Sequence, residues 1–223
     1  MICARSTCAL LVRVLTSVSF LTLTGCSFIT GHVTEYCNSR AYVQIPLGDH
    51  LTSRFDSGAP VRLGILPFSV PANLAPRTGN NHTVSNELAW KVHAEMLAQG
   101  AVPIVEVLNR EDWPGKRDEF FAGNFGALSV AREAGYDLVF VGYVEPMSSL
   151  DAVTAQGKLI ETESGITLWY GTTTAISARP NVRNNLSYAW ITNQRPDLLS
   201  QPELFAKLAE CMVMEATSDN MTP

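Results

Sequence analysis

The histidines are the first side chains to consider for metal binding or acid–base chemistry, because an imidazole can serve either purpose. The sequence has four of them, and they lie far apart: His32, His50, His82 and His93. None belongs to an H-E-x-x-H run or to a Cys/His spacing that binds zinc. Only His93 falls on a helix predicted from the hydrophobic pattern. We therefore interpret each as a solvated or core histidine and predict no metal site and no cofactor.

Glu161 and Glu163 are the two carboxylates whose spacing would allow acid–base work. Residues two apart on a strand point to the same face, so the pair would lie side by side. A solvated strand edge explains such a pair more simply than catalysis does. The sequence also has no G-x-S-x-G nucleophile elbow and no phosphate-binding loop. We predict that the protein is not an enzyme, and a small-molecule or glycan hydrolase is the weakest alternative.

The residues around Cys26 indicate a different chemistry, the acylation of a thiol. Arg5 and Arg13 precede an apolar run from Val14 to Leu23, which is the composition of an export signal. The run is shorter than the roughly 20 residues of a membrane-spanning helix. It ends in Leu23-Thr24-Gly25-Cys26, which resembles the lipobox of bacterial lipoproteins. That resemblance implies signal cleavage just before Cys26 and an acylated Cys26 that attaches the chain to a membrane.

The export signal sets the predicted organisation of the chain. Residues 1–25 are the signal peptide, 26–60 a lipidated tether, 61–217 one domain, and 218–223 a frayed end. An uncleaved anchor or an ordinary secretory signal with an accidental cysteine are the alternatives to lipidation. Ser27 favours the outer membrane, because in the lipoproteins that the lipobox resembles an Asp at this position commonly retains the chain in the inner membrane. The expected location is the periplasmic face of the outer membrane.

Two cysteines, Cys37 and Cys211, remain once Cys3 and Cys8 leave with the signal and Cys26 carries lipid. In an oxidising compartment such an even pair can form a disulfide, which would join the tether to the last helix. Buried free cysteines are also common, and Cys211 has the spacing of a core position on that helix. The sequence leaves both possibilities open.

The composition is that of a globular body with an acidic surface. Hydrophobic residues make up 46% of the chain and charged residues 17%, and the net charge is −5. Loss of Arg5 and Arg13 with the signal would leave 14 basic residues against 21 acidic ones. This balance disfavours nucleic acid and anionic lipid head groups as partners. After the signal, no apolar stretch approaches the length of a membrane span.

Hydrophobic periodicity predicts an α/β (α+β) fold with helices packed on a single mixed sheet. The body follows the order β-α-β-α-β-β-β-α, after one strand in the tether. The predicted strands cover 41–47, 61–68, 102–108, 138–144, 155–163 and 166–179, and the predicted helices cover about 83–100, 117–134 and 200–216. The apolar run 138–144 is expected in the middle of the sheet. Ser164-Gly165 is expected to be the hairpin turn between the last two strands.

Helix ends and faces are also predicted. Thr83 or Ser85 should cap the first helix of the body, and the spacing of Ser200 and Glu203 fits a capping box for the last. Gly100 and Gly135 should end the first and second helices. Phe121, Phe125 and Leu128 are expected on one buried face of the second helix.

Several segments together resemble one family. They are ILPF at Ile65–Phe68, VEVLNRED at Val105–Asp112, AREAGYDLVFVGYV at Ala131–Val144 and LIETESGITLW at Leu159–Trp169. Their order and spacing are similar to the periplasmic domain shared by the curli secretion lipoprotein CsgG and the penicillin-binding-protein activator LpoB, which also resembles the N-terminal domain of TolB. The resemblance covers residues 60 to 215. Tyr136 replaces the usual Ala of a Gly-Ala-Asp motif, and the insertion 180–197 has no counterpart in the family.

This resemblance implies an adaptor in envelope biogenesis that binds a periplasmic protein, such as a peptidoglycan synthase or an assembly component. The alternative is an oligomeric secretion subunit of the CsgG kind, so a homo-oligomer stays open. That alternative needs two membrane-crossing hairpins, at roughly 9–11 residues per strand, and no loop of the sequence offers them. We therefore favour the adaptor.

The residues predicted to bind the partner are loop aromatics, which often anchor interfaces. They are Trp113 in the charged segment 109–116, and Tyr188 and Trp190 in the insertion 180–197. Indoles folded back on the domain edge are the alternative, since isolated apolar residues at a surface are common.

Overall fold

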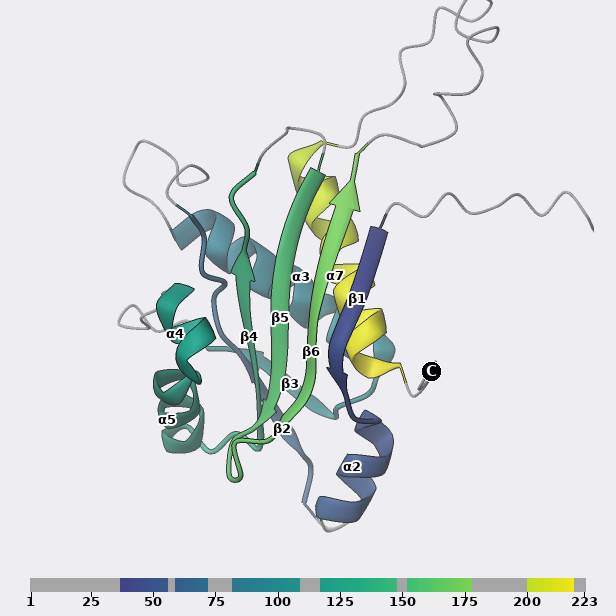
Figure 1. Ribbon diagram of the computed structural model, residues 1–223. Helices are drawn as coiled ribbons and strands as arrows, with labels where there is room; N and C mark the ends of the chain where they lie inside the picture. The colour runs from purple at the N-terminus through teal and green to yellow at the C-terminus, as the bar shows by residue number, and fades with distance from the viewer. Residues whose placement is uncertain are drawn as a thin grey trace, which may run out of the picture. The chain divides into compact units, whose positions relative to one another are not determined.

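Six strands form one mixed sheet in the computed structural model (Figure 1), which describes residues 37–55, 59–71, 82–108, 117–147, 152–177 and 200–218. The strands are β1 (Cys37–Gln44), β2 (Arg62–Ile65), β3 (Ile104–Val107), β4 (Leu138–Val144), β5 (Ala152–Glu161) and β6 (Thr167–Ile176). Their order across the sheet is β1-β6-β5-β4-β2-β3. β3, β2 and β4 are parallel, while β4, β5, β6 and β1 pair antiparallel. The predicted mixed sheet with packed helices is confirmed.

β4 occupies the inner position that its apolar sequence predicted. All seven of its residues are buried, and it pairs with β2 on one side and β5 on the other. A strand covered on both faces needs apolar residues throughout, which is why LVFVGYV was recognisable. The β5–β6 hairpin also turns where expected, through residues 162–166.

Helices cover the two faces of the sheet unequally. They are α2 (Leu47–Arg54), α3 (His82–Gln99), α4 (Arg117–Ala122), α5 (Phe125–Glu133) and α7 (Gln201–Thr217). α3 packs on β2 and β3, α7 packs on β1, β5 and β6, and the two helices contact each other behind the sheet (Figure 1). On the opposite face, α4 and α5 pack on β4. None of the described helices is long and apolar enough to cross a membrane.

The larger hydrophobic core lies between the sheet and the α3–α7 pair. It includes Leu88 and Met96 of α3, Leu208 and Met212 of α7, and Trp169 of β6, all at most 1% exposed. A smaller core lies under α4 and α5 and contains Phe120, Leu128, Ala131, Tyr136, Val139, Val141 and Tyr143. The half of this face formed by β5, β6 and β1 is therefore open to solvent in the described residues, and side chains there alternate between buried and half-exposed.

The body begins earlier than predicted. β1 is the edge strand of the sheet and pairs antiparallel with β6, and α2 follows it at Leu47–Arg54. The predicted boundary at residue 61 is therefore wrong, because residues 37–54 belong to the domain and not to a tether. The strand predicted at 41–47 begins and ends earlier, at Cys37–Gln44. The pattern gave no sign of α2, which has few apolar residues and is held by contacts far away in the sequence.

The ends of α3 and α7 show how capping decides helix boundaries. Ser200 and Glu203 form the predicted capping box at α7, where the Ser200 N–H donates to Glu203 Oε2 at 2.7 Å. Ser85, by contrast, does not cap α3, which already begins at His82. Its hydroxyl donates to the Phe68 carbonyl oxygen at 2.5 Å and so fixes the segment that follows β2. Gly100 takes a left-handed conformation at the end of α3, as predicted.

The helix predicted over 117–134 is two helices. α4 ends before Gly123 and Asn124, which have φ values of 115° and 56°, and a left-handed pair interrupts a right-handed helix. The break turns Phe120 into the core, while Phe121 and Phe125, expected to be buried, are exposed. α5 then ends before Gly135, which also has a positive φ, as predicted.

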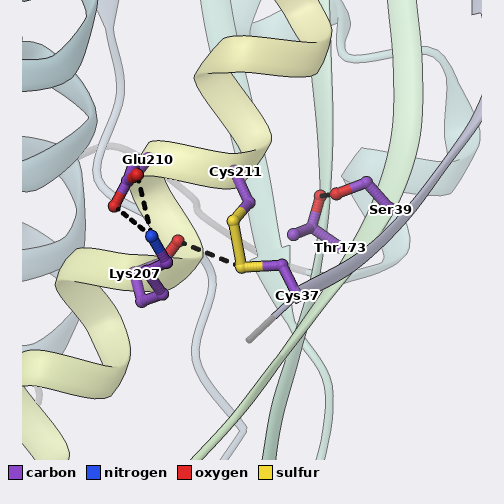
Figure 2. The surroundings of a disulfide bond; sticks show 6 residues. All are labelled: Cys37, Ser39, Thr173, Lys207, Glu210 and Cys211. Carbon is purple, nitrogen blue, oxygen red and sulfur yellow. Dashed lines mark hydrogen bonds and ion pairs between the residues drawn. A yellow bond between two sulfur atoms is a disulfide. The ribbon is translucent and has the colours of Figure 1, made fainter. Parts of the chain in front are cut away.

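A disulfide joins Cys37 and Cys211, one of the two possibilities that the sequence left open. Their Cα atoms are 6.4 Å apart and 174 residues apart in the sequence. Figure 2 shows the bond between the start of β1 and the middle of α7, beside the Lys207–Glu210 ion pair at 2.8 Å. The Lys207 carbonyl oxygen lies 3.5 Å from Cys37 Sγ, a contact without a hydrogen bond because a disulfide sulfur carries no hydrogen. The edge strand is thus covalently attached to the helix that covers the sheet.

Candidate functional site

The residues that the sequence singled out fall into two groups. Cys26, Trp113, Tyr188 and Trp190 lie outside the described residues, so lipidation and the loop aromatics stay predictions. The carboxylates Glu161 and Glu163 and the disulfide lie within them, as do His50 and His93. Within the described part of the chain, no group of three His, Cys, Asp or Glu side chains could hold a metal ion.

Glu161 is not on a solvated strand edge. It is the last residue of β5 and is 1% exposed, whereas Glu163, in the turn, is 82% exposed. Arg54 of α2 contacts both, with its Nε 2.8 Å from Glu161 Oε1 and an Nη2 3.1 Å from Glu163 Oε2. The Ser164 hydroxyl donates to Glu161 Oε2 at 2.6 Å. The carboxylate therefore fastens α2 to the β5–β6 turn.

The environment of Glu161 favours its charged form. Burial alone would raise its pKa, but the hydrogen bonds from Ser164 and Arg54 and the nearby Arg54 charge together lower the pKa below its ordinary value of 4.5. A general acid would need a raised pKa, so this carboxylate is poorly suited to protonate a substrate. It stays ionised and paired.

The contacts of Glu161 also differ from those of a hydrolytic triad. In a triad the hydroxyl donates to an imidazole, and the imidazole donates to the acid. Here the Ser164 hydroxyl donates directly to the acid, and His50 Nε2 lies 3.5 Å from the same Glu161 Oε2. Among the described residues, the hydrogen-bond partner of the Ser164 hydroxyl is thus a carboxylate and not an imidazole.

The rest of the turn is also occupied by structural contacts. The Thr162 hydroxyl donates to the Tyr136 carbonyl oxygen at 2.6 Å, and its N–H donates to the Asp137 carbonyl oxygen at 2.9 Å. Arg132 of α5 donates to the carbonyl oxygens of Thr162 and Glu163. We call Arg54, Glu161, Thr162, Ser164 and Arg132 the turn cluster. Its polar groups bind one another and hold α2, α5 and the hairpin together.

The open half of the sheet carries a different kind of surface, a row of aromatic rings. The ring centroids of Phe121 and Phe120 of α4 are 5.2 Å apart, in an edge contact. The Phe120 centroid lies 6.3 Å from that of Tyr170 of β6, and the Tyr170 centroid lies 5.0 Å from that of Tyr42 of β1. We call these four residues the aromatic row. It runs from α4 across β5 and β6 to the edge strand.

The strand register explains why these rings meet. Lys158 of β5 and Val43 of β1 are both paired with Tyr170, on either side of β6. The register of β1 shifts between Ala41 and Val43, so Tyr42 is the extra residue of a bulge. A bulge re-aims a side chain at a sheet edge, and here it brings Tyr42 onto the Tyr170 ring.

Three cations lie over the rings. At the two ends of the row, the Arg117 guanidinium is 5.8 Å from the Phe121 ring centroid and the Arg40 guanidinium is 5.3 Å from the Tyr42 centroid. In the middle, Lys158 Nζ is 4.4 Å from the Phe120 centroid and 5.1 Å from the Tyr170 centroid. Cations within about 6 Å of a ring centroid are attracted by the ring electrons. The row is therefore locally basic on a chain whose net charge is −5.

The middle of the row is fixed and its end is exposed. Lys158 Nζ donates to the Phe120 carbonyl oxygen at 2.6 Å, and burial lowers its pKa. The Tyr170 hydroxyl donates to Gln156 Oε1 at 2.9 Å, and burial, with smaller effects of Tyr42 and Glu145, raises the pKa of Tyr170. Tyr42, in contrast, is 52% exposed, and Arg40 and Phe121 are also exposed. This arrangement can contact a partner without rearranging the sheet.

Sequence reasoning missed the aromatic row. The alternation of polar residues along β5 and β6 indicated which side chains share a face, but not that Phe120 and Tyr42 would join them. The helix break at Gly123-Asn124 and the strand bulge at Tyr42 change the directions of the Phe120 and Tyr42 rings. Hydrophobic periodicity, which assumes an uninterrupted helix or strand, does not predict these directions.

Comparison with known proteins gives limited information. No family model matches the sequence, and no curated protein matches it. Similar solved structures include the PelC dodecamer from Paraburkholderia phytofirmans, at 13% identity over 81% of this chain and 96% of that chain, with a TM-score of 0.47. Lipoprotein GNA1162 from Neisseria meningitidis matches at 16% identity over 60% of this chain and 92% of that chain, with a TM-score of 0.32.

LpoB, which the sequence motifs resemble, is also among the similar structures. Its C-terminal domain from Salmonella enterica matches at 14% identity over 59% of this chain and 93% of that chain, with a TM-score of 0.30. Likenesses at these identities and TM-scores define neither the family nor the function of this chain.

Proposed function

We propose that this protein is a lipoprotein of the bacterial envelope whose α/β body is a non-catalytic adaptor that docks a protein partner on the aromatic row. The lipobox-like residues before Cys26 support the anchor. The resemblance to CsgG, LpoB and TolB supports a location on the periplasmic face of the outer membrane. The aromatic row is the observation that carries the docking function.

Two properties of the row favour a protein with an acidic surface as the partner. Tyrosine and arginine are enriched among residues that dominate binding energy at interfaces, and Tyr42 and Arg40 are adjacent and exposed. Carboxylates of a partner would meet Arg40 and Arg117 at the two ends of the row, on a chain that is otherwise acidic. The turn cluster supports a non-catalytic role, because its carboxylate is already paired with Arg54.

Site-specific cross-linking tests the docking surface. A photoreactive amino acid is placed at residue 42 or, as a control, at residue 166 in the full-length chain, and cells are irradiated before envelopes are isolated. Ile166 is 47% exposed, close to the 52% of Tyr42, but lies in the β5–β6 turn. The proposal predicts a defined cross-linked protein from position 42 that is lost with Arg40→Ala and is absent at position 166. Identical products from both positions would contradict it.

The anchor is tested separately. Mass spectrometry of the amino-terminal peptide should show an acylated Cys26, and Cys26→Ala should release the protein from membranes. An unmodified amino terminus would refute lipidation but would leave the docking surface open to the cross-linking test.

A further inference from the structure

The sheet has two edges, and they are built differently. Among the described strands, β3 stands at one end of the strand order and β1 at the other. An edge strand leaves every second backbone N–H and C=O group without a strand partner, so it can pair with another chain unless the fold prevents this. The features of each edge therefore indicate which of the two can bind a partner.

The β3 edge carries several features that prevent strand pairing. β3 has only four residues, Ile104–Val107, and Pro103 directly before it has no N–H to donate. The Glu106 side chain is 49% exposed and keeps a charge on the strand. His93 of α3 reaches the same strand, where its Nε2 lies 3.0 Å from the Val105 carbonyl oxygen. Short strands, prolines and charges are the means by which proteins block an edge, so β3 is a blocked edge.

The β1 edge has fewer of these features. β1 has eight residues, Cys37–Gln44, none of which is proline or lysine, and Arg40 is its only charged residue. Its register with β6 is regular over Cys37–Ala41 and shifts only at the bulge of Tyr42. A bulge also hinders pairing at an edge, but this one lies beyond the regular part of the strand. The stretch Cys37–Ala41 is therefore an edge that a further strand can join.

Both ends of β1 are fixed to α7. The disulfide joins Cys37 to Cys211, and the Gln44 amide donates to the Ser218 hydroxyl oxygen at 2.7 Å, where the chain leaves α7. Figure 2 shows the first of these attachments. A segment that is already held in its binding conformation loses less freedom when a partner binds. The edge is therefore preorganised for pairing.

We propose that the protein partner of the aromatic row binds by adding an extended, acidic segment as a new strand along Cys37–Ala41 of β1. Strand addition rests on the docking function proposed above, because it states how the partner that reaches Tyr42 is held. The backbone groups of a strand edge select an extended segment, since its N–H and C=O groups recur at the same spacing. Tyr42, Val43 and Ile45, which are 52%, 38% and 36% exposed, supply apolar contacts just beyond the paired stretch.

Charge complementarity makes the added segment acidic. Arg40 is exposed, and its guanidinium lies 5.3 Å from the Tyr42 ring centroid. Opposite charges on neighbouring strands stabilise a sheet, whereas like charges directly opposite each other destabilise it. Two copies of β1 offer each other no such pair, because Cys37–Gln44 contains no acid. An acidic segment of a different protein therefore fits this edge better than a second copy of β1 does.

Cross-linking with residue-level mapping tests strand addition. A photoreactive amino acid is placed at residue 38, 42 or 45 of the full-length chain, cells are irradiated, and the cross-linked peptides are sequenced by mass spectrometry. Asn38, Tyr42 and Ile45 are all exposed, and residue 166 is the control. Because paired strands rise equally per residue, the three positions should react with one partner segment of about ten residues, in order along its sequence. That segment should contain Asp or Glu.

Variants of Arg40 test the charge. Arg40→Glu should lower the cross-linked yield from residue 38 at least about tenfold, as for an interface hot spot. Arg40→Lys is the matched control, because it keeps the positive charge, and it should retain most of the yield. Circular dichroism checks that both variants are folded.

Three results would overturn strand addition. They are cross-links to scattered or unordered partner segments, a product between two copies of this chain, and a yield that Arg40→Glu leaves unchanged. Scattered products from a single partner would leave docking on the aromatic row in place. The absence of any product at residue 42 would instead contradict the docking function, and strand addition with it.

Discussion

The turn of the β5–β6 hairpin and the open face of the sheet use their polar and charged groups in opposite ways. At the turn cluster, Glu161, Arg54 and Ser164 bind one another, and the carboxylate is buried. On the open face, Arg40 and Tyr42 lie at the surface. Within the described ranges, their side chains contact each other, the Tyr42 ring contacts Tyr170, and the Thr172 hydroxyl lies 3.4 Å from the Tyr42 hydroxyl. A cluster of chemically capable residues is therefore evidence of function only when its groups are not already used by the fold.

Removing the buried carboxylate is expected to give the largest effect. Glu161→Ala removes the hydrogen bonds that the buried carboxylate accepts from Arg54 and Ser164 and detaches α2 from the turn. Because Arg54 itself is 46% exposed, the free energy of unfolding should fall by about 2 kcal/mol, the order of hydrogen bonds to a charged group. Glu163→Ala is the matched control, because an exposed ion pair contributes less than about 1 kcal/mol. Urea unfolding followed by circular dichroism measures both. Equal decreases in the free energy of unfolding for the two variants would contradict the different roles given to buried Glu161 and exposed Glu163.

Acid should weaken the same cluster, by less than the deletion does. The folded-state pKa of Glu161 is lower than its ordinary value of 4.5, so its contribution is fully present above pH 4.5 and is lost as the pH falls through the folded pKa. The free energy of unfolding should therefore fall with decreasing pH below 4.5. In Glu161→Gln this fall should be shallower, as measured by urea unfolding at several pH values.

Changes in the aromatic row should affect binding more than folding. Tyr42→Ala should weaken partner binding by about tenfold, in the range of an interface hot spot, and change the free energy of unfolding by under about 1 kcal/mol because the side chain is half exposed. Ile166→Ala is the control of similar exposure. Affinity is measured by titration of the cross-linked partner once it has been identified. A large decrease in the free energy of unfolding of Tyr42→Ala would indicate that the aromatic row stabilises the fold and does not serve binding.

Added salt is expected to have the smallest effect, a modest weakening of partner binding with little change in stability. At 0.5 M salt, screening should weaken partner binding by a few fold, because Arg40 and Arg117 are exposed. The buried Glu161 pair is screened much less, so the unfolding midpoint of the protein should change little. If salt does not change binding, the affinity comes from the aromatic rings, and Arg40 and Arg117 do not contribute to it.

Much of the fold was predictable because local signals agreed with the tertiary structure. The apolar run of β4, the capping box at Ser200 and the left-handed Gly100 and Gly135 each act over a few residues. α2 was missed because the contacts that hold it are distant in the sequence, such as the hydrogen bond from Arg54 to Glu161, 107 residues away.

The candidate site was less predictable than the fold. Glu161 was interpreted as solvated because strand alternation says nothing of the α2 helix that covers it. The aromatic row requires the pairing of β1 with β6, which has no local signal, and the helix break after α4. That break lies at Gly123-Asn124, two residues that favour a left-handed helix end, but the apolar spacing on either side predicted one continuous helix. Trp113, Tyr188 and Trp190 stay predictions.

The disulfide has a mechanical consequence. A pull on the chain before Cys37 would, without the bond, unzip β1 from the edge of the sheet one residue pair at a time, beginning at Cys37 and Ala175. With the bond to Cys211, the load passes at once into α7, which spans β1, β5 and β6. Tension from an anchor would thus be shared across the whole layer, and the bulged Tyr42 would keep its place on Tyr170 while the domain is under strain.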